Sequence, residues 1–101
     1  MGNVILGVLV RQEDGQKFPI EDEVTVSIIG RHCQCDLQIE KPYVSKVHAI
    51  ICRENGSLVL EDLGGGSGTR VNQFAVERKV LSDGDRILIG REELFVLTTR
   101  S

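Results

Sequence analysis

Three residues have the types and spacing of a hydrolase site. Ser45, His48 and Asp62 could serve as a nucleophile, its general base and the acid that orients the base. The turn that presents a serine nucleophile usually has glycines on both sides, in a G-x-S-x-G pattern, and no such glycines flank Ser45. The sequence therefore favours a protein that is not an enzyme.

A second group of residues consists of zinc-ligand types: His32, Cys33, Cys35, His48 and Cys52. Paired cysteines of structural zinc sites usually have two residues between them, whereas Cys33 and Cys35 have one. Small buried thiols are also common in protein cores. We therefore expect no metal and no cofactor. Three cysteines are an odd number for a disulfide framework, which fits a reducing compartment better.

Two further segments have the chemistry of phosphate binding. Gly30-Arg31 follows the apolar run 24–29, and an arginine at the end of a strand suits bidentate contact with a phosphate. The glycine-rich segment 64–69 could hold a phosphate through its backbone N–H groups. It lacks the lysine and the following helix of a nucleotide-binding loop. The alternatives for these two segments are a solvated surface charge and a flexible loop.

The net charge restricts the classes of partner. Twelve Lys and Arg against fifteen Asp and Glu give a net charge of −3 and a pI of about 5.3. The basic residues are scattered singly, whereas a nucleic-acid-binding face is densely basic. The longest apolar run, residues 4–10, is far shorter than the roughly 20 residues that cross a bilayer. We therefore expect a soluble protein with no membrane partner and no direct nucleic-acid partner.

Short runs rich in Val, Ile and Leu, separated by turn dipeptides, predict strands through most of the chain. These runs are residues 4–6, 8–10, 24–29, 37–39, 47–52, 58–60, 87–89 and 94–97. Asn55-Gly56 lies between two of them and predicts a tight hairpin with positive φ at both residues. No window has the apolar period of a helix. Residues 1–101 are therefore expected to form one all-β domain, a two-sheet sandwich.

The phosphate-binding segments and the serine–histidine pair occur in a familiar order. Gly30-Arg31, Ser45-Lys46-Val47-His48 and Gly68-Thr69-Arg70-Val71-Asn72 have the order and spacing of a forkhead-associated (FHA) domain. Cys35-Asp36-Leu37, Leu60-Glu61-Asp62 and Ser82-Asp83-Gly84-Asp85 also resemble signatures of the family, so the resemblance covers nearly the whole chain. It implies a β-sandwich of about eleven strands that binds phosphothreonine through the loops at one end.

The resemblance assigns binding roles to five residues. Arg31 matches the arginine that grips the phosphate, Ser45 the serine whose hydroxyl donates to it, and Lys46 a neighbour that touches phosphate or peptide backbone. Gly66 replaces a residue that often donates a hydroxyl to the phosphate, and Ser67 replaces an asparagine that holds the peptide backbone. We therefore expect a partly degenerate pocket with weak or undetectable phosphothreonine binding. The alternative is a competent reader that recruits a phosphorylated partner.

The resemblance assigns structural roles to five other residues. His48 matches a histidine that braces the loops, and Gly30 a glycine that allows a turn. Gly68, Thr69 and Asn72 match positions that stabilise the loop architecture. Cys35-Asp36 and the run 42–46 further resemble FHA domains of nuclear DNA-damage and chromatin adaptors. That resemblance implies a nuclear protein–protein interaction module.

The first and last predicted strands lack the usual polar face. Residues 4–10 and 94–97 are apolar on both sides, and the first and last strands of an FHA domain lie in one sheet. We therefore expect a homodimer through this sheet. Ile5 and Leu9 form one candidate contact set, and Leu6, Val8 and Val10 form the other. The alternative is that these side chains lie under loops or belong to the ordinary apolar surface.

Overall fold

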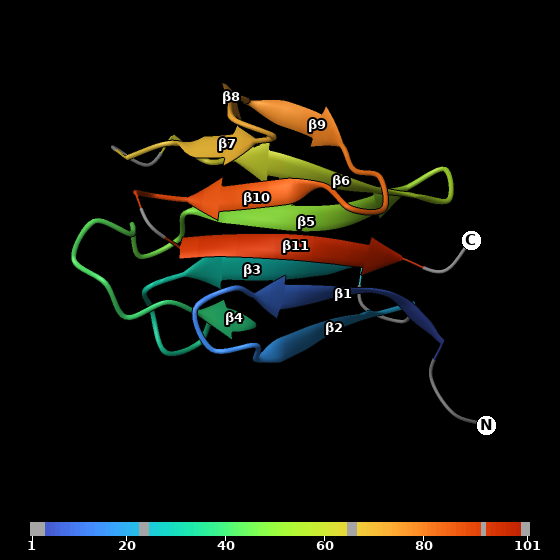
Figure 1. Cartoon of the computed structure of the whole chain (residues 1–101), viewed down its shortest axis with the longest axis horizontal. Coiled ribbons are helices and arrows are strands. Elements are labelled where there is room, and N and C mark those ends of the chain that lie inside the picture. The colour runs from blue at the N-terminus through green and yellow to red at the C-terminus, as the bar shows by residue number, and fades with distance from the viewer. Residues whose placement is uncertain (1–3, 23–24, 65–66, 92, 100–101) are drawn as a thin grey trace.

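The chain forms two packed β-sheets (Figure 1). The computed structural model describes residues 4–22, 25–64, 67–91 and 93–99. Within these ranges the strands are β1 (Ile5–Arg11), β2 (Lys17–Glu21), β3 (Val26–Gly30), β4 (Leu37–Gln38), β5 (Ala49–Glu54), β6 (Ser57–Asp62), β7 (Thr69–Val71), β8 (Phe74–Ala75), β9 (Arg78–Val80), β10 (Arg86–Ile89) and β11 (Glu93–Thr99). The predicted all-β sandwich of about eleven strands is confirmed.

Six strands form one sheet, in the order β2-β1-β11-β10-β7-β8, and five form the other, in the order β4-β3-β5-β6-β9. All neighbouring strands are antiparallel except β3 and β4. The connections β3–β4, β4–β5, β6–β7 and β10–β11 meet at the left of Figure 1, which we name the loop end. The opposite end carries the β5–β6 turn and is named the hairpin end.

The core lies between the sheets and consists of the inward side chains of both. Alternation along each strand places one face in the core, as expected for a half-buried sheet. The buried apolar cluster contains Leu9, Ile20, Ile29, Leu37, Ile39, Val44, Ala49, Ile51, Leu58, Leu60, Val71, Leu81, Ile87, Ile89, Phe95 and Leu97. Among the described residues, no helix is long and apolar enough to span a membrane.

The two apolar sets on β1 do not divide as the alternation predicts. Leu9 is buried, whereas Val8 and Val10 are half-buried on the outer face. The pairing with β2 shifts register between Ile5 and Gly7, and Leu6 packs against the core. Leu6 therefore does not share the outer face with Val8 and Val10, and Ile5 is 37% exposed rather than buried beside Leu9.

Most of the predicted apolar runs form strands, and the differences lie at strand ends and in strands near the sheet edges. Residues 4–6 and 8–10 were expected as separate strands, but β1 is continuous through Gly7. The positive φ values at Asn55 (49°) and Gly56 (80°) confirm the predicted hairpin. The strands β2, β7, β8 and β9 did not follow from the apolar pattern, and Val24, at the start of one predicted strand, lies outside the described residues.

Candidate phosphate-binding site

Arg31 is the first residue after β3 and is fixed to the β4–β5 connection by two hydrogen bonds. Its backbone N–H donates to the carbonyl of Ser45 at 2.9 Å, and its Nε donates to the carbonyl of Val44 at 3.0 Å. An arginine has five N–H donors, so the four on the terminal nitrogens remain available. No carboxylate of the described residues forms an ion pair with Arg31. The guanidinium is therefore both positioned and free to receive an anion.

Gly30 allows this arrangement through close packing rather than through a left-handed turn. A Cβ atom at Gly30 would collide with the backbone carbonyl of Lys46. Gly30 does not have a positive φ, so it is not needed for a turn, which was the reason expected from the sequence. A glycine is needed here because two backbone segments approach each other closely. The absence of a side chain lets the β4–β5 connection lie directly against the end of β3.

His48 is fully buried and joins the loops through both ring nitrogens. Nδ1 accepts the backbone N–H of Ser45 at 3.1 Å, and Nε2 lies 2.7 Å from the carbonyl oxygen of Gly68. Because a backbone N–H can only donate, Nδ1 must be the acceptor and Nε2 must carry the proton. The histidine thus holds Ser45 and Gly68 at fixed positions.

Gly68 connects three loops through one carbonyl oxygen. This oxygen accepts the His48 ring N–H and also the backbone N–H of Gly90 at 3.1 Å. Thr69, the next residue, is buried and donates its hydroxyl to Asp62 at 2.9 Å. The β6–β7 connection is therefore attached to the β4–β5 and β10–β11 connections and to the end of β6.

Ser67 uses its hydroxyl inside the protein. Its Oγ donates to the backbone carbonyl of Tyr43 at 2.6 Å. Ser67 is half-buried, and this bond draws the β6–β7 connection towards the β4–β5 connection. The other residue at which the chain departs from the family pattern, Gly66, lies outside the described residues.

These contacts surround a cleft of about 240 Å³ at the loop end. It is lined by Arg31, Pro42, Tyr43, Val44, Ser45 and Ser67. The Ser45 hydroxyl has no hydrogen-bond partner among the described residues and is half-buried beside Arg31. Lys46 follows it and is exposed. The cleft offers an unpaired guanidinium and a free hydroxyl, which are donors suited to a phosphate.

Asn72 lies apart from this cleft. It follows β7 with a φ of 51°, and its amide donates to Asp85 at 3.0 Å while its side-chain oxygen accepts the backbone N–H of Arg86. Asp85 in turn accepts the backbone N–H of Ser82 at 2.8 Å. Asn72 therefore connects the β7–β8 turn with the start of β10 and does not reach the loop end.

The described residues are not arranged as a hydrolase triad or as a zinc site. Asp62 contacts Thr69 and Gly64, and His48 contacts the backbone of Ser45 rather than its hydroxyl, so the three residues do not form a relay. Within the described ranges, no three His, Cys, Asp or Glu residues cluster as metal ligands. The Cys35 thiol donates to the carbonyl of Lys46, and burial raises the pKa of this thiol.

Tyr43 is a site residue that the sequence did not single out. Its carbonyl accepts Ser67, and its hydroxyl donates to the buried Glu93 at 3.4 Å. Glu93 also lies 3.7 Å from Arg11, which stacks over the Phe18 ring. Nothing in the local pattern around Tyr43 indicates this role, because its partners lie 24 and 50 residues further along the chain.

The fold agrees with the FHA family, whose domain model matches residues 27–90. This chain belongs to the FHA family. The glycogen accumulation regulator GarA of Mycobacterium tuberculosis is 33% identical over 97 residues, which are 96% of this chain and 59% of the regulator. The oxoglutarate dehydrogenase inhibitor of Corynebacterium diphtheriae is 35% identical over 80 residues, which are 79% of this chain and 54% of the inhibitor. The chain thus spans less than two thirds of the length of these relatives.

Two solved structures have the same architecture. Mycobacterium tuberculosis EmbR in complex with a low-affinity phosphopeptide has a TM-score of 0.88 at 24% identity, covering 96% of this chain and 25% of EmbR. A structure from an analysis of phosphothreonine-dependent FHA domain interactions has a TM-score of 0.86 at 25% identity, covering 95% of this chain and 98% of that one. At such identities the likeness to EmbR shows the fold alone.

The expectation of a nuclear DNA-damage or chromatin adaptor is wrong. The relatives are mycobacterial and corynebacterial regulators, and bacteria have no nucleus. The residues behind that expectation, Cys35-Asp36 and the run 42–46, form the β3–β4 and β4–β5 connections. These connections position the cleft, which is a property of the fold and not of a cellular compartment.

Proposed function

We propose that residues 1–101 act as one protein–protein interaction module that binds phosphothreonine-containing partners at the loop-end cleft. The single observation that carries the proposal is the state of Arg31, whose Nε and backbone N–H are bonded to the β4–β5 connection while its terminal donors are free. The free hydroxyl of Ser45 lies beside it, and the exposed ammonium of Lys46 follows in the chain. The module acts by binding and not by catalysis.

In the proposed mechanism, hydrogen-bond donors bind the phosphate, and loops that are already held in place present these donors. The phosphate accepts charge-assisted hydrogen bonds from Arg31 and one from Ser45. His48 and Gly68 hold the loops before the ligand arrives, which reduces the ordering that binding requires. Lys46 adds positive charge for a phosphate or a peptide backbone.

The cleft offers fewer hydrogen-bonding groups to the peptide backbone than to the phosphate. The Ser67 hydroxyl is engaged with Tyr43, so Ser67 does not supply the contact that the resemblance assigns to an asparagine there. We therefore propose phosphate-dependent binding that is weaker than low micromolar for a peptide with a single phosphothreonine. A bond to a charged group contributes roughly 1.5–3 kcal/mol, and each 1.4 kcal/mol is a factor of about ten in affinity.

The relatives extend the proposal to regulation. One is named a glycogen accumulation regulator and another an inhibitor of oxoglutarate dehydrogenase. Their names favour a module that regulates its partner by binding it. Because this chain spans 54–59% of those proteins, the proposal concerns the phosphothreonine-binding module and not a named target.

Isothermal titration with phosphothreonine peptides tests the proposal. Each peptide is compared with its unphosphorylated form, and the protein with Arg31→Ala. We expect saturable binding of the phosphorylated form only, with at least a tenfold loss in Arg31→Ala. Arg86→Ala is the matched control, because Arg86 is also exposed and unpaired among the described residues but does not line the cleft. Binding that ignores phosphorylation or Arg31 would contradict the proposal.

A second proposal, homodimerisation, rests on the outer face of the six-stranded sheet. Val8, Val10, Leu94 and Val96 are half-buried there, on the paired strands β1 and β11. An isologous dimer that persists needs on the order of 1,000 Å² with an apolar centre. Sedimentation at high micromolar concentration should show a dimer that Val10→Glu dissociates without unfolding. The buried Leu9→Glu should unfold the protein, and a monomeric wild type would end this proposal.

A further inference from the structure

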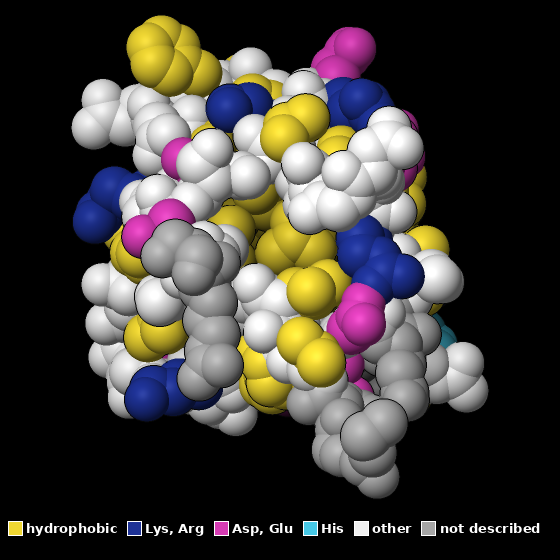
Figure 2. All heavy atoms as spheres, turned by 90° about the vertical axis from the view of Figure 1, so that its right-hand side faces the viewer, with side chains coloured by type: hydrophobic (Ala, Val, Ile, Leu, Met, Phe, Trp, Pro, Cys, Tyr) yellow, Lys and Arg dark blue, Asp and Glu magenta, His cyan; other side chains and the backbone are white. Residues whose placement is uncertain are grey.

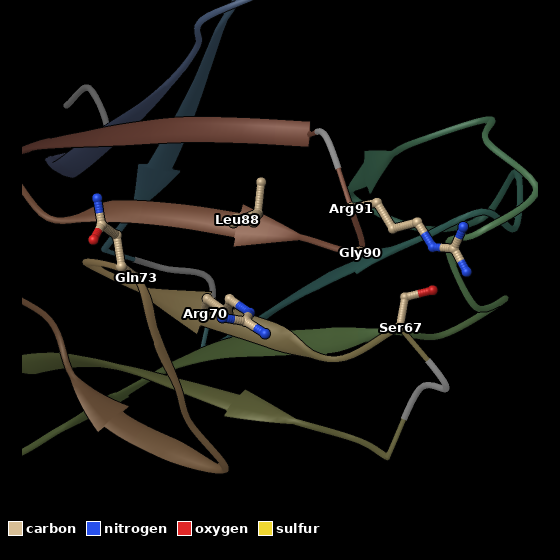
Figure 3. A pocket seen from close by; sticks show the side chains of 6 residues that line it. All are labelled: Ser67, Arg70, Gln73, Leu88, Gly90 and Arg91. Carbon is tan, nitrogen blue, oxygen red and sulfur yellow. The ribbon is translucent and has the colours of Figure 1, made fainter.

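A second cleft, of about 590 Å³, lies beside the candidate phosphate site on the outer side of the six-stranded sheet (Figure 3). It is lined by Ser67, Arg70, Gln73, Leu88, Gly90 and Arg91. Arg70 and Leu88 are paired neighbours on β7 and β10, so their side chains lie on the same face of the sheet. Figure 3 shows Ser67 and Arg91 together at the loop end and Arg70 further along β7.

The two arginines of this cleft have no acidic partner among the described residues. Arg70 and Arg91 are both exposed, and neither forms an ion pair or a side-chain hydrogen bond with any residue that the structure describes. By contrast, Arg53 and Arg78 are paired with Asp22 and Glu54. Two guanidinium groups around a cleft with a single apolar wall residue, Leu88, favour an anionic ligand with planar or tetrahedral oxygens.

The second cleft adjoins the first. Ser67 lines both of them, and the Gly90 N–H bonded to the Gly68 carbonyl fixes the β10–β11 connection beside the β6–β7 connection. A Cβ at Gly90 would meet the Tyr43 ring at 2.7 Å, so the wall between the clefts is closely packed. An extended peptide rises about 3.3 Å per residue, so residues that flank a phosphothreonine held at Arg31 can pass Ser67, which lines both clefts.

We propose that Arg70 and Arg91 form a second anion subsite, which takes a second phosphorylated or acidic side chain of the same phosphothreonine peptide. The inference rests on the proposed function, because the phosphate held by Arg31 brings the second group to the cleft at a high effective concentration. The subsite supplies affinity that Ser67 does not provide. It therefore restricts the partners to segments with two anionic groups at a fixed spacing.

Fluorescence anisotropy with labelled peptides tests the subsite. One peptide carries a single phosphothreonine, and the others add a second phosphothreonine or a glutamate at successive positions on both sides. At one or two adjacent positions we expect the second phosphate to tighten binding about tenfold, which is about 1.4 kcal/mol. Glutamate should give a smaller gain at the same position, because a carboxylate carries one charge and a phosphate about two.

Variants separate this subsite from general charge. Arg70→Gln with Arg91→Gln should abolish the gain while leaving affinity for the single phosphothreonine within about twofold, because neither side chain lines the first cleft. Lys17→Gln with Arg86→Gln removes the same charge from exposed positions outside both clefts and should keep the gain. Thermal unfolding checks that both proteins are folded.

The outcomes distinguish the two proposals. If the single phosphothreonine binds through Arg31 and no second group adds affinity, the second subsite is wrong and the proposed function stands. An equal loss of the gain in the Lys17 and Arg86 control also overturns the subsite. If neither the singly nor the doubly phosphorylated peptides bind, both proposals are wrong.

Discussion

The arginines at the two ends of the sandwich differ in whether they are paired with carboxylates. At the hairpin end, Asp22 pairs with Arg53, and Glu54 pairs with Arg78, which opens β9 opposite Glu61. At the loop end, Arg31, Arg70 and Arg91 have no carboxylate partner among the described residues. Three arginines without a described carboxylate partner therefore lie at the loop end of a chain whose net charge is −3.

The two ends also differ in the groups that lie below their surfaces. At the loop end, the buried imidazole of His48 and the carbonyl of Gly68 hold the connections together. Arg11 is the exception, because it lies against the buried Glu93 and supports the strands. The hairpin end instead has a hollow of about 240 Å³ with hydrophobic side chains at its centre (Figure 2). Its lining includes Leu6, Leu58 and Leu81.

Removal of the buried histidine should have the largest effect on this comparison. His48→Ala leaves the Ser45 N–H without an acceptor and opens a cavity, so we expect a loss of about 3 kcal/mol in the free energy of unfolding. Urea denaturation measures the loss, which should be the same with and without zinc. His32→Ala is the control, because His32 is exposed and its ring accepts only the backbone N–H of Gln34 among the described residues. Equal effects in the two variants would contradict a bracing role for His48.

The close approach at Gly30 should have the next largest effect. Gly30→Ala forces the Lys46 carbonyl away, and such overpacking costs about 2 kcal/mol. Because Ser45 and Arg31 lie on the two backbones that separate, phosphopeptide affinity should also fall about tenfold, or about 1.4 kcal/mol. Gly15→Ala has a positive φ of 75° but open space around it, so it should lower stability without changing affinity. Titration calorimetry on both variants decides this, and unchanged affinity in Gly30→Ala would contradict the role of the close approach.

Restoring the two residue types of the family pattern should strengthen phosphothreonine binding at the loop end. Gly66→Thr with Ser67→Asn should strengthen binding of a single phosphothreonine peptide about tenfold, because one recovered bond to a charged ligand contributes roughly 1.5 kcal/mol or more. The comparison is made by titration against wild type, with an unphosphorylated peptide as the control. No gain would place the weakness elsewhere in the cleft.

The exposed pair at the hairpin end should have the smallest effect. A hydrogen bond from Arg78 lowers the pKa of Glu54. The pair therefore contributes stability above the unfolded carboxyl's pKa, and this contribution is lost as the pH falls through the lower folded pKa. The difference in urea midpoint between wild type and Glu54→Gln should be small at neutral pH and should vanish in acid. A difference that grows in acid, or a change in phosphopeptide affinity, would contradict this assignment.

The sequence predicted the fold best where strands are buried. The runs around Ile29, Ile51 and Leu60 follow from their apolar residues, and the Asn55-Gly56 turn follows from its residue types. The edge strands were missed because their pattern is weak. Residues of β8 and most of β9 are exposed, and β2 contains Pro19, which a sheet tolerates only near an edge.

The candidate site was predictable only in part. The order of Arg31, Ser45 and His48 along the chain indicates the family, and the structure brings them to one end. The cleft of Arg70 and Arg91 could not be predicted, because it depends on the pairing of β7 with β10 and on the contact between Gly68 and Gly90. Local sequence contains neither the register of distant strands nor the packing of Tyr43 beside Gly90.

The most direct test of phosphate binding at the loop end is a two-dimensional NMR titration of the ¹⁵N-labelled protein with a phosphothreonine peptide. The account predicts that the backbone amides of Arg31, Ser45 and Ser67 and the Arg31 Nε–H shift progressively, while those of Gly56 and Leu58 at the hairpin end do not. The unphosphorylated peptide should leave all of them unchanged. Shifts confined to the hairpin end, or identical shifts with both peptides, would contradict the account.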